Sequence, residues 1–521
     1  MSLAWRNTLA AATRIIPINM TSNQVATLVR QCFGFEPTAD QAKAIDVFSK
    51  FATDRSAHPL MILRGSAGTG KTSVAGAIVK AMRKLGHRTV LLAPTGRAAK
   101  VIGVNAGHEA WTIHRRIYRQ TRLGGPFSLA PNMSRDTLFI VDEASMIAND
   151  GLRQAVFGTG RLLDDLVSYV YSGQNCSVML VGDKAQLPPV GEEESPALSP
   201  SFMAGYGLQV YCADLDEVLR QSRQSGILFN ATAIRNMITH DEATRMPKVR
   251  FGGFADIVMV PGDELIETLA TSYAEVGSDE TMVVTRSNKR ANVYNQGIRN
   301  TVLMREEQLV PGDMVMVVKN NYYWTEMEIT RMLKEARASA AGGTAIPAES
   351  LAEVSRIPSF IANGDRAAVV SVRNQRQLYG FNFVDLWLRF PDYDGYELKA
   401  TVITDSLSTE APALTKEQND ELFDRVMEDY ADIRTKPERI KRLKQDPYFN
   451  AMQIKYAYAV TCHKAQGGQW SHVYVDQGYM TDEMLSPDYI HWLYTAFTRA
   501  TDKLFLVNWP KAQTIAEENG G

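Results

Sequence analysis

Residues 60–72, LMILRGSAGTGKT, join an apolar run to a glycine-rich turn that ends in a lysine and a threonine. The helical pattern of SVAGAIVKAMRKLG follows at 73–86, so the turn lies between a buried strand and a helix. Backbone N–H groups of such a turn wrap around phosphate oxygens, and the helix dipole favours the negative charge. The predicted nucleotide-binding residues of this loop are Gly65, Ser66, Ala67, Gly68, Thr69, Gly70, Lys71 and Thr72.

Three further apolar runs follow this loop at 88–94, 138–142 and 177–183, and each ends in proline or aspartate. Buried strands that alternate with helices are typical of a parallel sheet, and ligands bind at the carboxyl ends of its strands. A second group of apolar runs is predicted to form another sheet. Its members are 281–285, 456–462, 472–476 and 503–507.

The segment between Arg305 and Asn450, inside this second group, breaks the alternation of strands and helices. Turn residues separate short strand-like runs there, which favours a small antiparallel barrel. Charged stretches at 325–339 and 415–445 are predicted to be helical, and the Gly- and Pro-containing piece at 338–350 is predicted to be a mobile loop.

The composition limits the class of protein to which this chain can belong. Net charge is −2, so nucleic-acid contacts would have to come from local patches. Four separated cysteines without a Cys-x-x-Cys pair argue against a zinc site or a disulfide framework and favour a cytoplasmic location. No apolar run is long enough to cross a bilayer.

Acidic and amide side chains complete the predicted nucleotide site. Asp142, at the end of a strand, would bind Mg²⁺, and the adjacent Glu143 would act as general base. Gln41, upstream of the loop, has the donor and acceptor needed to recognise adenine. These features predict a phosphate-loop ATPase with ATP and Mg²⁺ as cofactors, but many kinases, transporters and switches share them.

Several further strings narrow the class. In chain order they are APTGRAAK (93–100), TIH (112–114), DEAS (142–145), GDKAQLPPV (182–190), LRQ (219–221), AVTCHKAQG (459–467) and YTAFTRA (494–500). This series resembles the motifs of superfamily 1B DNA helicases of the RecD-like and Dda type, and the resemblance spans about residues 38–508.

The resemblance implies an α/β fold with two RecA-like parallel-sheet motor domains and an SH3-like β-barrel insertion in the second. The expected divisions are an N-terminal tail (1–30), the first motor domain (31–215, with a small pin insertion at about 119–137), the first part of the second (216–305), the insertion with helical embellishments (306–451) and the second part (452–521).

The resemblance also assigns roles in the nucleotide cleft. Gln186 would sense the γ-phosphate, and Arg220 and Arg499 would approach it from the second domain. Such arginines are worth on the order of 10³–10⁵ in rate. Gln466 would also lie near the nucleotide. Asn288 and Asn295 belong to another family segment without a firm role.

Contacts to the single-stranded DNA are expected at short polar and basic residues of both domains. Those that match the family positions are Pro94, Thr95, Thr112, His114, Thr461, His463 and Lys464. Residues 111–122, WTIHRRIYRQTR, form a basic patch in which Tyr118 either stacks on a base or belongs to the core. Phe127 is the candidate wedge of the pin.

The resulting hypothesis is a monomeric ATP-dependent DNA helicase that moves 5′ to 3′ on single-stranded DNA and unwinds duplex junctions. Replication or repair proteins are its expected partners, with roles in DNA repair or recombination. An RNA helicase of the same superfamily and an ATP-dependent switch without translocation are the alternatives.

Overall fold

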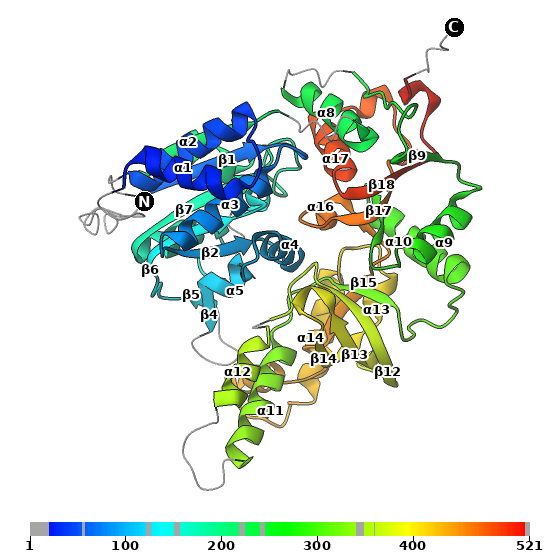
Figure 1. Ribbon diagram of the computed structural model, residues 1–521. Coiled ribbons are helices and arrows are strands. Elements are labelled where there is room, and N and C mark those ends of the chain that lie inside the picture. The colour runs from blue at the N-terminus through cyan, green and yellow to red at the C-terminus, as the bar shows by residue number, and fades with distance from the viewer. Residues whose placement is uncertain are drawn as a thin grey trace.

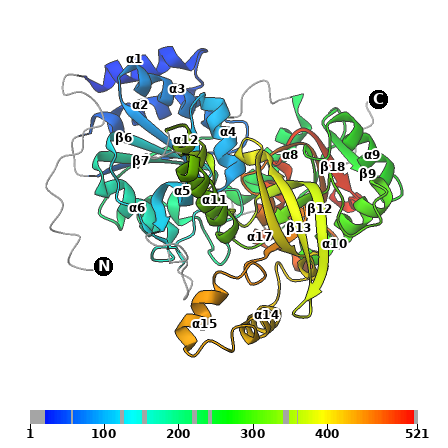
Figure 2. The ribbon, with the colours of Figure 1, turned by 90° about the horizontal axis from the view of Figure 1, so that it is seen from below.

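The computed structural model describes residues 20–54, 58–120, 127–150, 157–217, 224–239, 245–339, 348–358 and 360–515. Two lobes lie beside each other, and a barrel lies below the second lobe (Figure 1). Seen from below, the long hairpin of β12 (Arg366–Leu378) and β13 (Phe381–Phe390) extends away from both lobes (Figure 2). The charged helices α14 (Lys416–Glu428) and α15 (Lys436–Leu443) extend away in the same view. No helix in the described ranges is long and apolar enough to cross a membrane.

The first lobe is built on a parallel sheet of six strands. In spatial order these are β3 (Ala110–Thr112), β2 (Arg88–Ala93), β6 (Arg135–Val141), β7 (Gln174–Gly182), β1 (Pro59–Gly65) and β8 (Gln209–Leu215). Its helices are α1 (Ser22–Phe33), α2 (Ala39–Thr53), α3 (Lys71–Lys84), α4 (Gly96–Ala106), α5 (Ile113–Ile117), α6 (Leu162–Ser172) and α7 (Pro200–Ala204). Separate apolar cores cover the two faces, so the central strands are buried on both sides, as the sequence predicts.

The predicted N-terminal tail is wrong from residue 22 onward, because helix α1 begins there. Thr21 and Gln24 form a reciprocal capping box that satisfies backbone N–H groups at the start of α1. Val25 and Val29 lie on one face of the helix and are fully buried against the first lobe. Residues 1–19 lie outside the described residues.

A short hairpin leaves the first lobe where the pin is predicted. Strands β4 (Tyr118–Gln120) and β5 (Phe127–Leu129) pair antiparallel, with Gln120 opposite Phe127. The connection between them lies outside the described residues.

The second lobe is a parallel sheet of five strands, in the order β16 (Ala459–Thr461), β10 (Thr281–Thr285), β17 (Trp470–Asp476), β18 (Ala500–Val507) and β9 (Ile257–Val260). Its helices are α8 (Gly226–Thr239), α9 (Leu265–Glu275), α10 (Asn288–Gly297), α16 (Cys462–Ala465) and α17 (Pro487–Phe497).

The barrel closes through β11 (Met314–Val317), β12 (Arg366–Leu378), β13 (Phe381–Phe390), β14 (Tyr396–Ile403) and β15 (Met452–Tyr456). Its helices are α11 (Tyr323–Ser339), α12 (Ala348–Arg356), α13 (Asp405–Ser408), α14 (Lys416–Glu428) and α15 (Lys436–Leu443). Most of the loop predicted at 338–350 lies outside the described residues, and α12 begins at its end. The predicted strand 456–462 is two elements, because the chain leaves the barrel at Tyr456 and enters the sheet at Ala459.

Barrel and second lobe share one continuous apolar core. A buried carboxylate also joins them: Asp313, at the start of the barrel, accepts Nε and Nη2 of Arg299, each at 3.0 Å. Arg305 Nη1 and the Tyr458 hydroxyl donate to the same carboxylate at 2.7 and 2.9 Å. These donors hold the pKa of Asp313 below its ordinary value despite burial. The barrel is therefore fixed to the second lobe by charged hydrogen bonds as well as by apolar packing.

Candidate nucleotide and nucleic-acid sites

The glycine-rich loop follows β1 and leads into α3. Gly68 and Gly70 have φ of 77° and 83°, a region that glycine adopts without strain. Lys71 Nζ donates to the carbonyl oxygens of Gly65 and Ser66 at 2.7 and 2.9 Å. The lysine thus lies over the loop, beside the Thr72 side chain that lines the same cavity.

Gln41 supports this loop from behind. Its side chain is fully buried, and Nε2 donates to the carbonyl oxygen of Thr69 at 2.9 Å. Its amide oxygen accepts the Thr38 N–H at 3.0 Å as part of a capping box. Each end of the amide forms a hydrogen bond in this structure, so Gln41 positions the loop, and its contact with adenine stays a prediction.

The acidic pair lies at the carboxyl end of β6. Glu143 N–H donates to Asp142 Oδ1 at 2.9 Å, and Glu143 has φ of 51°, in the left-handed region. Burial, with the nearby Glu143 charge, raises the pKa of Asp142 to about 6. The Asp142 carboxylate and the Thr72 hydroxyl line the same cavity, and oxygen ligands of this kind suit Mg²⁺.

Arg499 reaches this cavity from the second lobe. Its side chain is 1% exposed, and its guanidinium donates to Thr495 O, Gly468 O and Thr498 Oγ1 at 3.0, 3.0 and 3.1 Å. Gln186 lies between the lobes. In the amide orientation that satisfies both neighbours, it donates to Glu143 Oε2 at 3.3 Å and accepts Arg499 Nη2 at 3.2 Å.

One cavity of about 300 Å³ therefore brings together the phosphate loop, the acidic pair, Gln186 and Arg499. Arg220 lies outside the described residues. Gln466 does not line this cavity. Its Nε2 donates to Leu187 O of the first lobe at 2.7 Å, so it joins the two lobes beside the nucleotide cavity.

Two further residues join the lobes at this cavity, and the sequence analysis gave them no role. The Tyr494 hydroxyl accepts the Ala67 N–H at 3.0 Å and donates to Asp183 Oδ2 at 2.5 Å. Arg235 Nη1 donates to Ser66 Oγ at 2.7 Å. Tyr494 belongs to the quoted YTAFTRA string, which was a signal that could have identified it. Arg235 lies in α8, where the sequence carries no such signal.

A second cavity of about 240 Å³, the strand cavity, lies between the lobes and the barrel. It is named for the nucleic-acid strand whose predicted contacts line it. It is lined by Pro94, Thr95, Thr112, His114, His463 and Lys464 from the predicted strand contacts, together with barrel residues. Thr461 is absent from this lining and lies at the N-cap of α16. Six of the seven positions that match strand contacts outside the pin thus meet in one cavity.

The second cavity contains the carboxyl groups of Asp365 and Asp392 as well as basic and hydroxyl groups. Burial lowers the pKa of His114 to about 4 and lowers the pKa values of His463 and Lys464. Thr95 and Thr112 cap α4 and α5 by accepting backbone N–H groups, each at 3.2 Å. Each hydroxyl can still donate its own proton.

Phe127 is the first residue of β5, at the end of the paired strands nearest their connection, and is only 5% exposed. Its ring centroid is 4.8 Å from those of Phe157 and Tyr322 and 6.0 Å from that of Phe360. Tyr322 and Phe360 belong to the insertion, so this aromatic cluster joins the first lobe to the barrel. The ring is covered in this conformation, and a wedge role for Phe127 stays a prediction.

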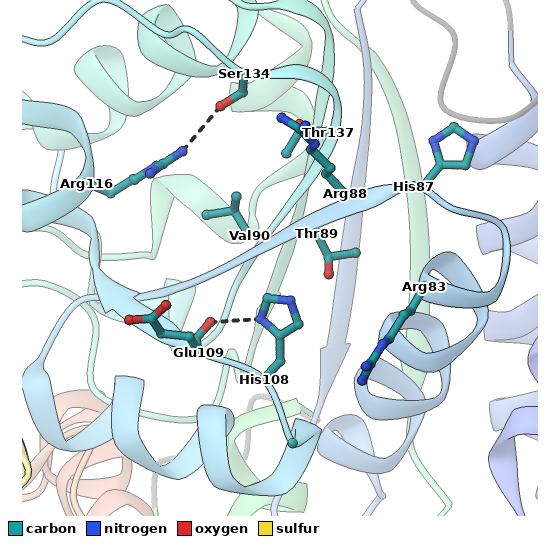
Figure 3. Close-up of a pocket in the computed structure, with 11 residues that line it drawn as sticks. Arg83, His87, Arg88, Thr89, Val90, His108, Glu109, Arg116, Ser134 and Thr137 are labelled. Atoms are coloured by element: carbon teal, nitrogen blue, oxygen red, sulfur yellow. Dashed lines mark hydrogen bonds between the residues drawn. The ribbon is translucent and has the colours of Figure 1, made fainter. Parts of the chain in front are cut away.

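Side chains of the basic patch at 111–122 lie in three places, which are the core of the first lobe and two cavities. Tyr118 is buried and its hydroxyl donates to Asp165 at 2.7 Å, which is the core alternative. On the short helix α5, His114 faces the strand cavity, whereas Arg116 faces a cavity of about 650 Å³ at the amino ends of β2 and β6 (Figure 3). There, Arg116 donates to Ser134 at 3.3 Å.

Asn295 has a structural role within the second lobe. Its side chain accepts the N–H groups of Tyr458 and Ala459 at 3.0 and 2.8 Å and donates to Ala459 O at 2.9 Å. Asn288 is the first residue of α10.

Known protein families match two parts of the chain. Residues 37–246 match an AAA domain family, and residues 456–507 match the UvrD-like helicase C-terminal domain. The first match covers the phosphate loop and the acidic pair, and the second covers Arg499.

Among characterised proteins, the chain is 28% identical over 279 residues to the ATP-dependent RecD2 DNA helicase of Deinococcus radiodurans, covering 51% of this chain and 34% of that protein. It is 26% identical over 294 residues to the ATP-dependent DNA helicase dda of Enterobacteria phage T4, covering 54% of this chain and 60% of that protein. The matched region thus spans less than two thirds of either relative.

A solved structure of Pif1 helicase from Bacteroides, in complex with ADP-AlF3 and ssDNA, aligns over 93% of this chain and 95% of that one. The sequence identity is 15% and the TM-score 0.43.

Proposed function

Because this chain belongs to the superfamily 1B helicases of the RecD-like and Dda type, we propose that it hydrolyses ATP to move along single-stranded DNA and unwind duplex DNA. The observation that carries the proposal is the shared cavity in which Lys71 of one lobe and Arg499 of the other face the same space. A phosphate bound there would interact with both lobes at once.

The residues of the cavity suit phosphoryl transfer. Lys71 is within reach of loop-bound phosphates, and Arg499 presents a fixed positive charge from the opposite lobe. Glu143 would orient water and accept its proton. Asp142 and Thr72 would hold Mg²⁺, which supplies positive charge against the phosphates when bound.

Gln186 links this chemistry to movement between the lobes. It contacts Glu143 on its own lobe and Arg499 on the other. Loss of the γ-phosphate removes the charge that draws Arg499 toward the loop, so hydrolysis favours an open cleft. Because the strand cavity lies between the same lobes, opening and closing would alter the grip on the strand.

The contacts to the strand are proposed at the cavity lined by Thr95, Thr112, His463 and Lys464. Hydroxyl and ammonium donors contact phosphates without reading bases, which suits a motor that moves over any sequence. The 5′-to-3′ direction is taken from the family resemblance.

The experiment is strand-stimulated ATP hydrolysis and unwinding, with DNA and RNA duplexes that carry either a 5′ or a 3′ overhang. We expect stimulation by single-stranded DNA and unwinding from the 5′ overhang. Activity with RNA alone would favour the RNA helicase, and absence of stimulation by any strand would favour the ATP-dependent switch. Unwinding from the 3′ overhang alone would overturn the direction.

A further inference from the structure

A buried arginine of the barrel lines the strand cavity without matching any of the quoted motifs. Arg366 is the first residue of β12, and its side chain is 5% exposed. Its Nη1 donates to Asp279 O at 3.2 Å. Nε and Nη2 are buried and have no hydrogen-bond partner among the described residues. The cavity that contains it also contains Thr95 and Lys464.

A second guanidinium lies beside it. Arg97 and Arg366 lie 4.6 and 5.7 Å from the ring centroid of Trp470. Burial and the positive charge of Arg97 lower the pKa of Arg366 to about 10, so the side chain remains a cation near neutral pH. Two guanidinium groups therefore lie in the cavity at the end where the barrel meets both lobes. Arg97 is paired with Glu280 at 3.4 Å, whereas Arg366 forms no ion pair among the described residues.

The adjacent carboxyl group does not neutralise this charge by contact. Asp365 Oδ2 accepts the Tyr393 hydroxyl at 2.7 Å and the Ala362 N–H at 2.6 Å. Burial raises the pKa of Asp365 to about 7, so a substantial fraction of this group is uncharged at neutral pH. Nearby Asp279, Glu280 and Asp392 favour the charged form of Arg366 at longer range.

A buried cation with two unused N–H donors is unfavourable unless an anion completes its hydrogen bonds. Nε and Nη2 of arginine point the same way and can bind two oxygens of one phosphate. Hydroxyl donors at Thr95 and Thr112 and the ammonium group of Lys464 line the same space. This set matches the repeating phosphates of a nucleic-acid backbone.

We propose that Arg366 binds a phosphodiester group of the single strand held between the lobes and the barrel. The inference rests on the proposed function and extends it, because it makes the barrel a direct contact of the strand. Since the barrel is fixed to the second lobe through Asp313, this contact moves with the second lobe.

The test uses the full chain and a fluorescently labelled oligo(dT), with affinity measured by anisotropy at several KCl concentrations. Arg366→Gln should weaken binding roughly 10–100-fold, as expected for loss of a charged hydrogen bond. The slope of log affinity against log salt should become shallower by about 0.7 for one lost phosphate contact. Arg366→Lys should keep most of the salt slope but lose affinity, because a single ammonium cannot form the paired contact.

The control is Arg373→Gln, which removes the same charge from an exposed position on the same strand β12. Its affinity and salt slope should match those of the unchanged protein. The melting temperature without DNA should be unchanged or higher for Arg366→Gln, because an unpaired buried cation is removed. A lower melting temperature together with an unchanged salt slope would assign Arg366 a structural role and overturn the proposal.

Two other outcomes separate the claims. If the unchanged protein binds oligo(dT) and Arg366→Gln binds it equally well with the same slope, the Arg366 contact is wrong and the proposed function stands. If inorganic phosphate raises the melting temperature through Arg366 while strand binding is unaffected by the substitution, the site takes a small anion instead. Failure of the unchanged protein to bind any strand would overturn both proposals.

Discussion

Arg499→Lys tests whether the second lobe contributes a fixed charge to the reaction. Three bonds of 3.0–3.1 Å to Thr495 O, Gly468 O and Thr498 Oγ1 hold the guanidinium in place. Lysine keeps the charge but has one nitrogen, so it cannot make these bonds and also meet Gln186. An arginine in this role raises the rate of ATP hydrolysis about 10³–10⁵-fold. Because lysine retains the charge, we expect a loss near the lower end of that range. We expect kcat to fall roughly 10³-fold, or about 4 kcal/mol.

The assay is phosphate release at saturating single-stranded DNA, with nucleotide affinity measured separately by a fluorescent ATP analogue. Affinity should change little, because the phosphate loop of the first lobe supplies most of the binding contacts. Arg389→Lys is the matched control, since Arg389 forms an exposed pair with Glu397 at 2.9 Å on the barrel. A kcat for Arg499→Lys within about tenfold of the unchanged protein, with normal melting, would refute the reasoning.

Other substitutions test separate parts of the structure. Lys71→Ala should abolish strand-stimulated ATP turnover with little change in melting temperature, and retained turnover would contradict the phosphate-loop assignment. Phe127→Ala removes a buried ring and should cost about 3–5 kcal/mol of local stability; it should impair unwinding more than translocation, and equal losses would contradict a pin function. Asp365 has a pKa of about 7 against an ordinary 3.8, so its unfolded form ionises first and stability is lost as pH rises from about 4 to 7. The pKa difference between the folded and unfolded states corresponds to up to about 4 kcal/mol of stability. Asp365→Asn should therefore reduce the fall in melting temperature between pH 4 and 7. An unchanged fall would contradict the raised pKa of Asp365.

The sequence was most informative where a local pattern determines the structure. The run 60–72 predicted strand, loop and helix, and the structure has β1 and α3 on either side of the loop. The strand-end positions also gave the meeting of Asp142 with Lys71, because parallel strands bring their carboxyl ends to one edge.

The features that could not be predicted from the sequence depend on tertiary contacts. Residues 456–460 are all aromatic or aliphatic, so nothing in the pattern marks the point where the chain passes from barrel to sheet. The support that Gln41 gives to the phosphate loop depends on its contact with Thr69, 28 residues later, which no local pattern indicates. The unpaired donors of Arg366 depend on neighbours from both lobes, which no single stretch of sequence encodes.

The carboxylate of Asp313 has a mechanical consequence. Because Arg299, Arg305 and Tyr458 converge on it, tilting the barrel against the second lobe would break several charged bonds at once. The rings of Phe127 and Tyr322, by contrast, can slide past one another without breaking any hydrogen bond between them. Of these two contacts of the barrel, the aromatic one is the easier to displace. The second lobe and barrel should therefore move as one body against the first lobe once the hydrogen bonds of Tyr494, Arg235 and Gln466 between the lobes open.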